Sequence, residues 1–267
     1  MRRTIVATTL GALLLSNPAA AVPGVDEPDK IHVNALRNPE MRKYKAILVG
    51  LDTFDRHHAL APAVPELRFR VEPRRGAGLP EAPKVRIEGE NDFVLPLALD
   101  ARNRFTVPRS EAALEAGGEL VLNQKRKSYQ IMPDVRTPGL PDNVRRLGDL
   151  RLECKVMFAI VKEEIPLFWV ATINGFLRTR DWCSFFKTYE HSIDFKTESP
   201  VVSAILSEGK RSAALKTGDH SFSISLNEPS WGDDALVELT FREPVAKKRS
   251  AGAAPIGTAG ETIRTAP

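Results

Sequence analysis

The chain has 267 residues, of which 42% are apolar and 27% are charged. This length and composition suit one large β domain or two of ordinary size, and they exclude global disorder. The formal net charge is +4, but Arg2 and Arg3 supply two of these charges and the tail after Pro244 adds a net +3, so residues 22–244 carry −1. A near-neutral body lacks the basic surface that nucleic acids require, so we expect no nucleic-acid partner.

Residues 1–21 have the three parts of a secretory signal peptide. Arg2 and Arg3 form a positively charged start, residues 5–15 are mostly apolar, and residues 19–21 form a small-residue cleavage site. We therefore expect cleavage after Ala21 and a periplasmic or secreted mature protein. The apolar stretch is shorter than the roughly 20 residues that cross a bilayer, so the mature chain is not expected to be transmembrane.

The next part of the chain predicts an extended lead-in over 22–40 and a β-sandwich over 41–135. Residues 66–72 alternate apolar and charged side chains, which is typical of a half-buried strand. The short apolar run 44–49 also fits a strand, and 110–118 holds one helical turn. Further strands are predicted at 85–87, 93–99, 105–107, 120–122 and 129–132.

The prolines and glycines of 136–148 predict a linker to a second, β-rich domain over 149–243. Its longest strand is expected at 150–160, where every second residue is apolar. The apolar period then becomes helical, and it predicts a mostly buried helix at about 163–178. Strands resume at 201–206, 213–215, 220–226 and 236–241. The tail 244–267 is expected to be disordered. The predicted fold class is therefore mainly β, with two β-sandwich-like halves, the second of which holds one buried α-helix.

Cys154 and Cys183 are the two cysteines of the chain. In an oxidising compartment such a pair usually forms a disulfide, and two buried free thiols are the alternative. The closed loop of 29 residues would stabilise the fold by roughly 3–4 kcal/mol in the chain-entropy model.

The segment 84–122 carries a family resemblance. It reads KVRIEGENDFVLPLALDARNRFTVP, followed after a short spacer by GGELVLN. Asp100, the run 104–106, Pro108 and the pair 117–118 match the pattern of carboxypeptidase regulatory-like β-sandwich domains, which are related to transthyretin, while Asn103 stands where these domains usually have a turn glycine. The layout of the whole chain also resembles uncharacterised secreted proteins of Gram-negative bacteria, which implies an exported location.

Histidines and acids offer only weak candidates for a catalytic or metal site. Asp55 and His58 could contribute to a metal site, but neighbouring His57 and His58 cannot easily bind one ion, and a polar surface turn is the simpler interpretation. His191 and Asp194 would face opposite sides of a strand. No nucleophile elbow, zinc-binding helix or phosphate loop is present in the sequence, which argues against an enzyme and predicts no cofactor.

Aromatic residues gather in the second half. Trp182 and Trp231 are candidate binding residues, and Trp231, in a predicted turn, is expected to be the more exposed. Core packing is the alternative for both rings.

These observations favour an exported, non-catalytic binding or structural β module of the cell envelope, which acts through Trp231, the loop 133–148 or exposed sheet edges on an envelope protein or glycan. Two alternatives remain open. One is a hydrolase with a dispersed His/Asp/Ser site near His57 or His191, and the other is a carbohydrate-binding β-sandwich that requires coplanar exposed aromatics.

Overall fold

The computed structural model describes residues 38–74, 82–126, 128–186 and 191–242. The predicted signal peptide 1–21, most of the lead-in 22–40 and the tail 244–267 lie outside the described residues. The fold is mainly β, as the sequence predicts, and in the described residues it comprises four sheets and four α-helices.

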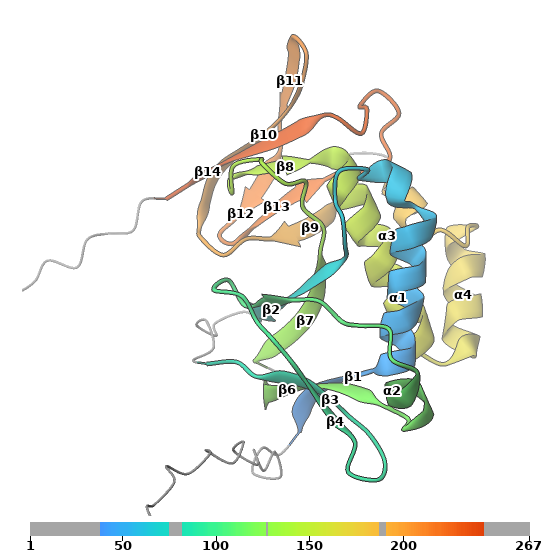
Figure 1. The fold of residues 1–267 in the computed structure, drawn as a ribbon. Coiled ribbons are helices and arrows are strands. Elements are labelled where there is room, and N and C mark those ends of the chain that lie inside the picture. Colours follow the sequence, from blue (N-terminus) through green and yellow to red (C-terminus); the bar gives the residue numbers. More distant parts are fainter. Residues whose placement is uncertain (1–37, 75–81, 127, 187–190, 243–267) are drawn as a thin grey trace, which may run out of the picture. The chain divides into compact units, whose positions relative to one another are not determined.

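The first half contains two antiparallel sheets (Figure 1). The four-stranded sheet has the order β1 (Pro39–Lys43), β6 (Glu119–Lys125), β3 (Val85–Glu88) and β4 (Val94–Leu97). The three-stranded sheet has the order β5 (Arg104–Phe105), β2 (Arg68–Pro73) and β7 (Tyr129–Asp134). The strand predicted over 66–72 is thus confirmed as β2, and the helical turn predicted over 110–118 as α2 (Glu111–Glu115).

The second half also contains two antiparallel sheets. One has the order β11 (Arg211–Ala214), β10 (Val201–Glu208), β14 (Leu236–Phe241) and β8 (Val144–Arg146). The other has the order β12 (Lys216–Gly218), β13 (Ser221–Ile224) and β9 (Ile193–Lys196). The strands expected at 201–206 and 236–241 are confirmed, and they pair as β10 and β14.

The strand predicted over 44–49 is wrong, because these residues begin helix α1 (Tyr44–Arg56). Tyr44, Ile47, Leu51 and Phe54 are buried, and their spacing of three or four places them on one helical face. A six-residue apolar run does not distinguish a strand from a helix by itself. The 3₁₀ turn η2 (His58–Leu60) follows α1.

The longest predicted strand, 150–160, is also wrong, because it lies within helix α3 (Leu147–Glu164). Two hydrophobic cores meet this helix from different sides. Leu152, Val156 and Ile160 belong to the core of the first half, whereas Leu150 and Cys154 belong to the core of the second. Each stripe has the four-residue spacing of a helix, and the two stripes are offset by two residues, or about 200°. Together they produce an alternation that imitates a strand.

Helices α1 and α3 pack side by side (Figure 1). Gly50 of α1 permits their close approach, because a Cβ at this position would lie 2.8 Å from Cδ1 and Cγ1 of Ile160. All described residues belong to one compact unit. The division into domains 41–135 and 149–243 stays a prediction.

The helix predicted over 163–178 exists as α4 (Leu167–Leu177), but the expectation that it is mostly buried is wrong. Pro166 separates α3 from α4: it holds Ile165 in extended backbone, which ends α3, and it immediately precedes the first turn of α4. Because α3 already occupies the space between the sheets, α4 lies outside both hydrophobic cores.

Candidate functional site

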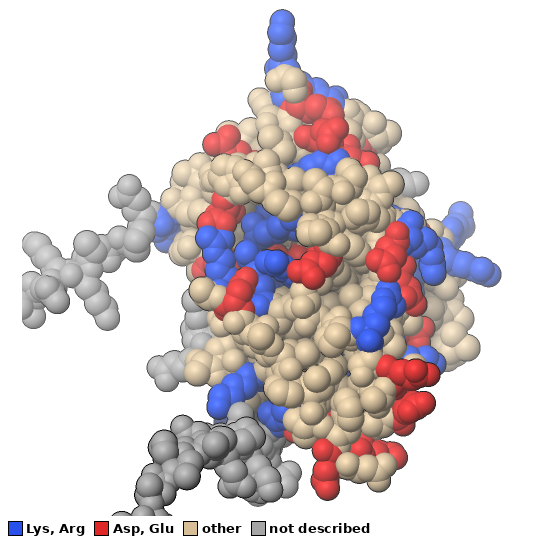
Figure 2. All heavy atoms as spheres, in the orientation of Figure 1, with Lys and Arg blue, Asp and Glu red and all other residues tan. Residues whose placement is uncertain are grey.

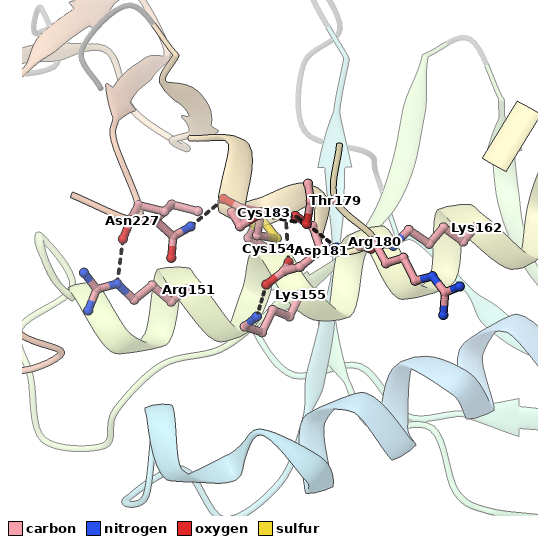
Figure 3. Close-up of a disulfide and its surroundings, with 11 residues drawn as sticks. Arg151, Cys154, Lys155, Lys162, Thr179, Arg180, Asp181, Cys183 and Asn227 are labelled. Atoms are coloured by element: carbon pink, nitrogen blue, oxygen red, sulfur yellow. Dashed lines mark hydrogen bonds and ion pairs between the residues drawn. A yellow bond between two sulfur atoms is a disulfide. The ribbon is translucent and has the colours of Figure 1, made fainter. Parts of the chain in front are cut away.

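The predicted disulfide between Cys154 and Cys183 is confirmed, with a Cα–Cα distance of 6.1 Å. It joins the middle of α3 to the short 3₁₀ helix η3 (Trp182–Phe185), and Figure 3 shows the two cysteines amid the polar contacts that surround the bridge. Lys155 Nζ lies 2.6 Å from Asp181 Oδ2, and Asn227 Nδ2 donates to the carbonyl oxygen of Cys183 at 2.5 Å. Helix α4 therefore lies in a loop that is closed covalently at its base.

Helix α4 presents apolar side chains to solvent. Of its eleven residues, all of which the structure describes, none is buried. The exposed fractions are 81% for Leu167, 71% for Phe168, 55% for Trp169 and 83% for Phe176. The helix sequence LFWVATINGFL contains no charge. Large exposed apolar patches on a folded protein usually mark an interaction site.

Contacts near η3 tie α4 and the segment directly after it to the rest of the fold. Trp182 Nε1 donates to Asn174 Oδ1 at 2.8 Å. Lys162 Nζ donates to the carbonyl oxygen of Arg180 at 2.5 Å and lies 4.8 Å from the centre of the Trp182 ring. These contacts and the disulfide hold α4 in place without covering its outer face.

The two candidate tryptophans are both buried, so the expectation that Trp231 is exposed is wrong. Trp231 is 8% exposed, and the Arg211 guanidinium carbon lies 4.0 Å from its ring centre. Trp182 is 5% exposed and packs edge-on against Phe158. Neither ring forms a flat platform on the surface, which the carbohydrate-binding alternative requires.

The metal candidates Asp55 and His58 are not brought together with other ligands. Asp55 Oδ2 and Asp52 Oδ1 pair with the Arg109 guanidinium at 2.7 and 2.6 Å. His58 Nε2 lies 2.7 Å from the Val64 carbonyl oxygen. In the part of the chain that the structure describes, no group of three or more His, Cys, Asp or Glu residues could hold a metal ion.

Of the other histidines, His57 is next to His58 in the chain, whereas His191 and His220 belong to the second half. His57 follows α1, and burial and the charges of Lys155 and Arg56 lower its pKa. His191 contacts the Phe185 ring. His220 precedes β13 at the surface, with Nε2 3.8 Å from Asp219 Oδ2.

A network of arginines and carboxylates, which sequence reasoning missed, lies where β2, β5 and β7 approach the loop 136–142. Asp134, at the end of β7, is buried and receives three guanidiniums. Its Oδ2 lies 2.9 Å from Arg104 Nε, and its Oδ1 lies 3.1 Å from Arg136 Nε and 3.8 Å from Arg70 Nη1. Nearby, the buried Arg145 donates to Glu153 Oε2 at 2.8 Å.

The pKa values reflect this crowding of charge. Burial raises the pKa of Asp134, but Arg70, Arg136 and the neighbouring arginines outweigh it and lower the value to about 2. Burial and the cations Arg145, Arg70 and Arg104 lower the pKa of Arg136 to about 10.

A cavity of about 280 Å³ opens over this network. Arg68, Arg104, Arg136 and Arg145 contribute to its wall. On the molecular face in Figure 2, basic and acidic atoms gather in the middle, below the upper sheets of Figure 1. The predicted partner loop 133–148 supplies one side of this cavity through residues 134 and 136–142.

Neither the helix surface nor the arginine network had a signal that identified it in the sequence. The arginines at positions 70, 104, 136 and 145 come from separate segments of the chain, and the folding of the sheets brings them together. No family model matches the chain, and no curated protein or solved structure matches it. Among the described residues, no helix has both the length and the apolar character to cross a membrane.

Proposed function

We propose that this chain is a non-catalytic binding protein of the cell envelope that docks α4 into an apolar groove of another envelope protein. The observation that carries the proposal is the exposure of Leu167, Phe168 and Phe176 on a short helix within a disulfide-closed loop. A periplasmic or secreted location agrees with the disulfide, since such bonds persist in oxidising compartments. We also propose that residues 41–135 form a β-sandwich of the carboxypeptidase regulatory-like kind.

The outer face of α4 has the arrangement of a helix that enters a groove. Phe168, Thr172 and Phe176 follow one another at four-residue spacing and are all exposed. Leu167, Ala171 and Gly175 form the neighbouring exposed row. Large anchors beside small residues let a partner surface approach the helix closely, as in helix-in-groove recognition.

Charges at the two ends of α4 favour a protein partner over an anionic lipid surface. The exposed Glu163 precedes the helix, while Glu164 beside it pairs with Arg42 within the fold, and Arg178 and Arg180 follow the helix. Helices that lie on membranes carry cations along a polar face, and α4 has none between residues 167 and 177. A protein groove can match the acid at one end and the base at the other.

Burial of the two phenylalanines supplies a measurable share of the affinity. Complete burial of one such side chain contributes about 1.5–3 kcal/mol. Because Phe168 and Phe176 are 71% and 83% exposed, replacement of both by serine should weaken binding by about 3 kcal/mol, or roughly 100-fold in Kd. The melting temperature should change little, because neither side chain supports a core.

Site-specific photo-crosslinking in the envelope tests the proposal. A photoreactive phenylalanine analogue at Phe168 should form one discrete protein adduct, and Phe176→Ser in the same chain should reduce its yield. The matched control places the analogue at Val202 of β10, which is 56% exposed on a surface remote from the disulfide loop. Equal or absent adducts at the two positions would contradict the proposal, as would binding of α4 to lipid vesicles in place of a protein.

A further inference from the structure

Four arginines and four carboxylates line the cavity, but in the network beneath it three guanidinium groups share two carboxylates. Arg70, Arg104 and Arg136 share Asp134, and Arg70 also pairs with Glu72. The guanidinium groups of Arg70, Arg104 and Arg136 therefore share the two carboxylates of Asp134 and Glu72. Arg145 does not change this difference, because Glu153 is its own counter-ion.

Other acids beside the cavity already have partners. Asp149 accepts from the Thr137 backbone N–H at 2.7 Å and from its hydroxyl at 2.8 Å. Asp142 pairs with Arg102, which does not line the cavity. Glu66 pairs with Arg68 at 3.4 Å. Within the described part of the chain, none of these carboxylates accepts a side-chain hydrogen bond from Arg104, Arg136 or Arg145.

Arg145 adds an independent indication of a missing acceptor. Its side chain is only 2% exposed and it lines the cavity. Its Nη2 donates to the carbonyl oxygen of Val135 and to Glu153, but within the described part of the chain its buried Nε has no hydrogen-bond partner. A buried donor without an acceptor is costly, so a ligand oxygen near this group would be favoured.

We propose that this cavity binds a small oxyanion, a carboxylate or a phosphate group, between Arg104, Arg136 and Arg145. Guanidinium groups match the planar, two-oxygen geometry of both groups. The volume of about 280 Å³ lies at the lower limit of small-molecule sites, which suits a small acid and not a dinucleotide. The bound anion adds a second counter-charge for the arginines that share Asp134. This site is separate from α4 and does not depend on the proposed docking function.

Titration calorimetry on the oxidised full-length mature chain tests the inference. Inorganic phosphate, acetate and succinate are added at constant ionic strength, with sodium chloride as the control salt. We expect saturable binding at one site per chain for phosphate, for the carboxylates or for both, and the comparison identifies the preferred group. Absence of saturable binding at millimolar concentrations would overturn the proposal.

Three variants locate the site. Arg136→Gln should weaken binding at least tenfold, and Arg136→Lys, which keeps the charge but loses the planar fork, should have an intermediate effect. Arg109→Gln removes an exposed, ion-paired arginine outside the cavity and should leave the affinity within twofold of wild type. Equal affinities in the Arg136→Gln and Arg109→Gln variants would show nonspecific surface binding and refute the assignment. Arg136 is only half-buried, so both of its variants should fold, which far-UV circular dichroism checks.

Discussion

Opening of the Cys154–Cys183 bridge should destabilise the protein by an amount that the loop length determines. The bridge closes a loop with a sequence separation of 29 residues, for which the chain-entropy model gives about 3.5 kcal/mol. For a domain of this size, 1 kcal/mol corresponds to about 2–4 °C in melting temperature. The double variant Cys154→Ala/Cys183→Ala should therefore melt roughly 7–14 °C below the oxidised wild type.

Circular dichroism melting of three samples measures this effect. The oxidised wild type, the reduced wild type and the double alanine variant are compared at the same concentration and pH. Reduction opens the same loop without a change in side-chain volume, so it controls for the small voids that alanine leaves at two buried positions. If the free energy of unfolding fell by less than about 1 kcal/mol in both the reduced protein and the double variant, the closed loop would not be a main source of stability.

Hydrogen exchange tests the local part of the same argument. Without the bridge, α4 keeps only a few ties, among them the bond from Trp182 to Asn174 and the contact of Lys162 with Arg180. Amides of residues 167–177 should then lose protection before those of α1 and β10. Uniform loss of amide protection across the chain would contradict the view that the disulfide holds α4 in its exposed position.

Three further substitutions test the packing and the buried charges. Gly50→Val should destabilise the fold by about 1–3 kcal/mol in urea unfolding, because its Cβ meets Ile160, whereas an unchanged midpoint would contradict close α1–α3 packing. Trp231→Ala should cost about 3–5 kcal/mol because the ring is buried, and a stable variant would contradict that placement. Asp134→Asn should cost about 3–5 kcal/mol at neutral pH, since it leaves buried guanidiniums unpaired. The pKa of Asp134 is lowered to about 2 in the fold, so its stabilisation is complete above about pH 4 and lost as the pH falls towards 2. The difference between wild type and Asp134→Asn should shrink by about 2 kcal/mol over that interval, and a constant difference would refute the ion-pair explanation.

Several features follow from local patterns in the sequence. The alternation in 66–72 predicts β2. Gly209, which follows β10 and precedes β11, adopts a positive φ of 60° that suits glycine in a tight turn. The cysteine pair predicts the bridge, because an isolated pair in an oxidising compartment usually forms a disulfide. The predicted signal peptide also rests on a local pattern, but residues 1–21 lie outside the described part of the structure and it stays a prediction.

Tertiary structure decided whether an ambiguous apolar segment became a strand or a helix, and whether it became core or surface. Residues 150–160 alternate like a strand because α3 lies between two cores, and a linear pattern does not show how many faces of a helix are buried. The apolar residues of α4 read as core, yet Phe168 and Phe176 face solvent because α3 has taken the interior position. Conversely, Trp231 lies in a polar turn and is buried.

The sequence by itself therefore determined the disulfide and the mainly β character of the chain, and it predicts export, because periodicity, cysteine number and leader composition are local properties. The tertiary structure alone decided which surfaces remain available for binding. Exposure of α4 and convergence of Arg104, Arg136 and Arg145 on one cavity depend on contacts between segments far apart in the chain. Such contacts leave no local trace, since each residue taken alone has an ordinary core or surface interpretation.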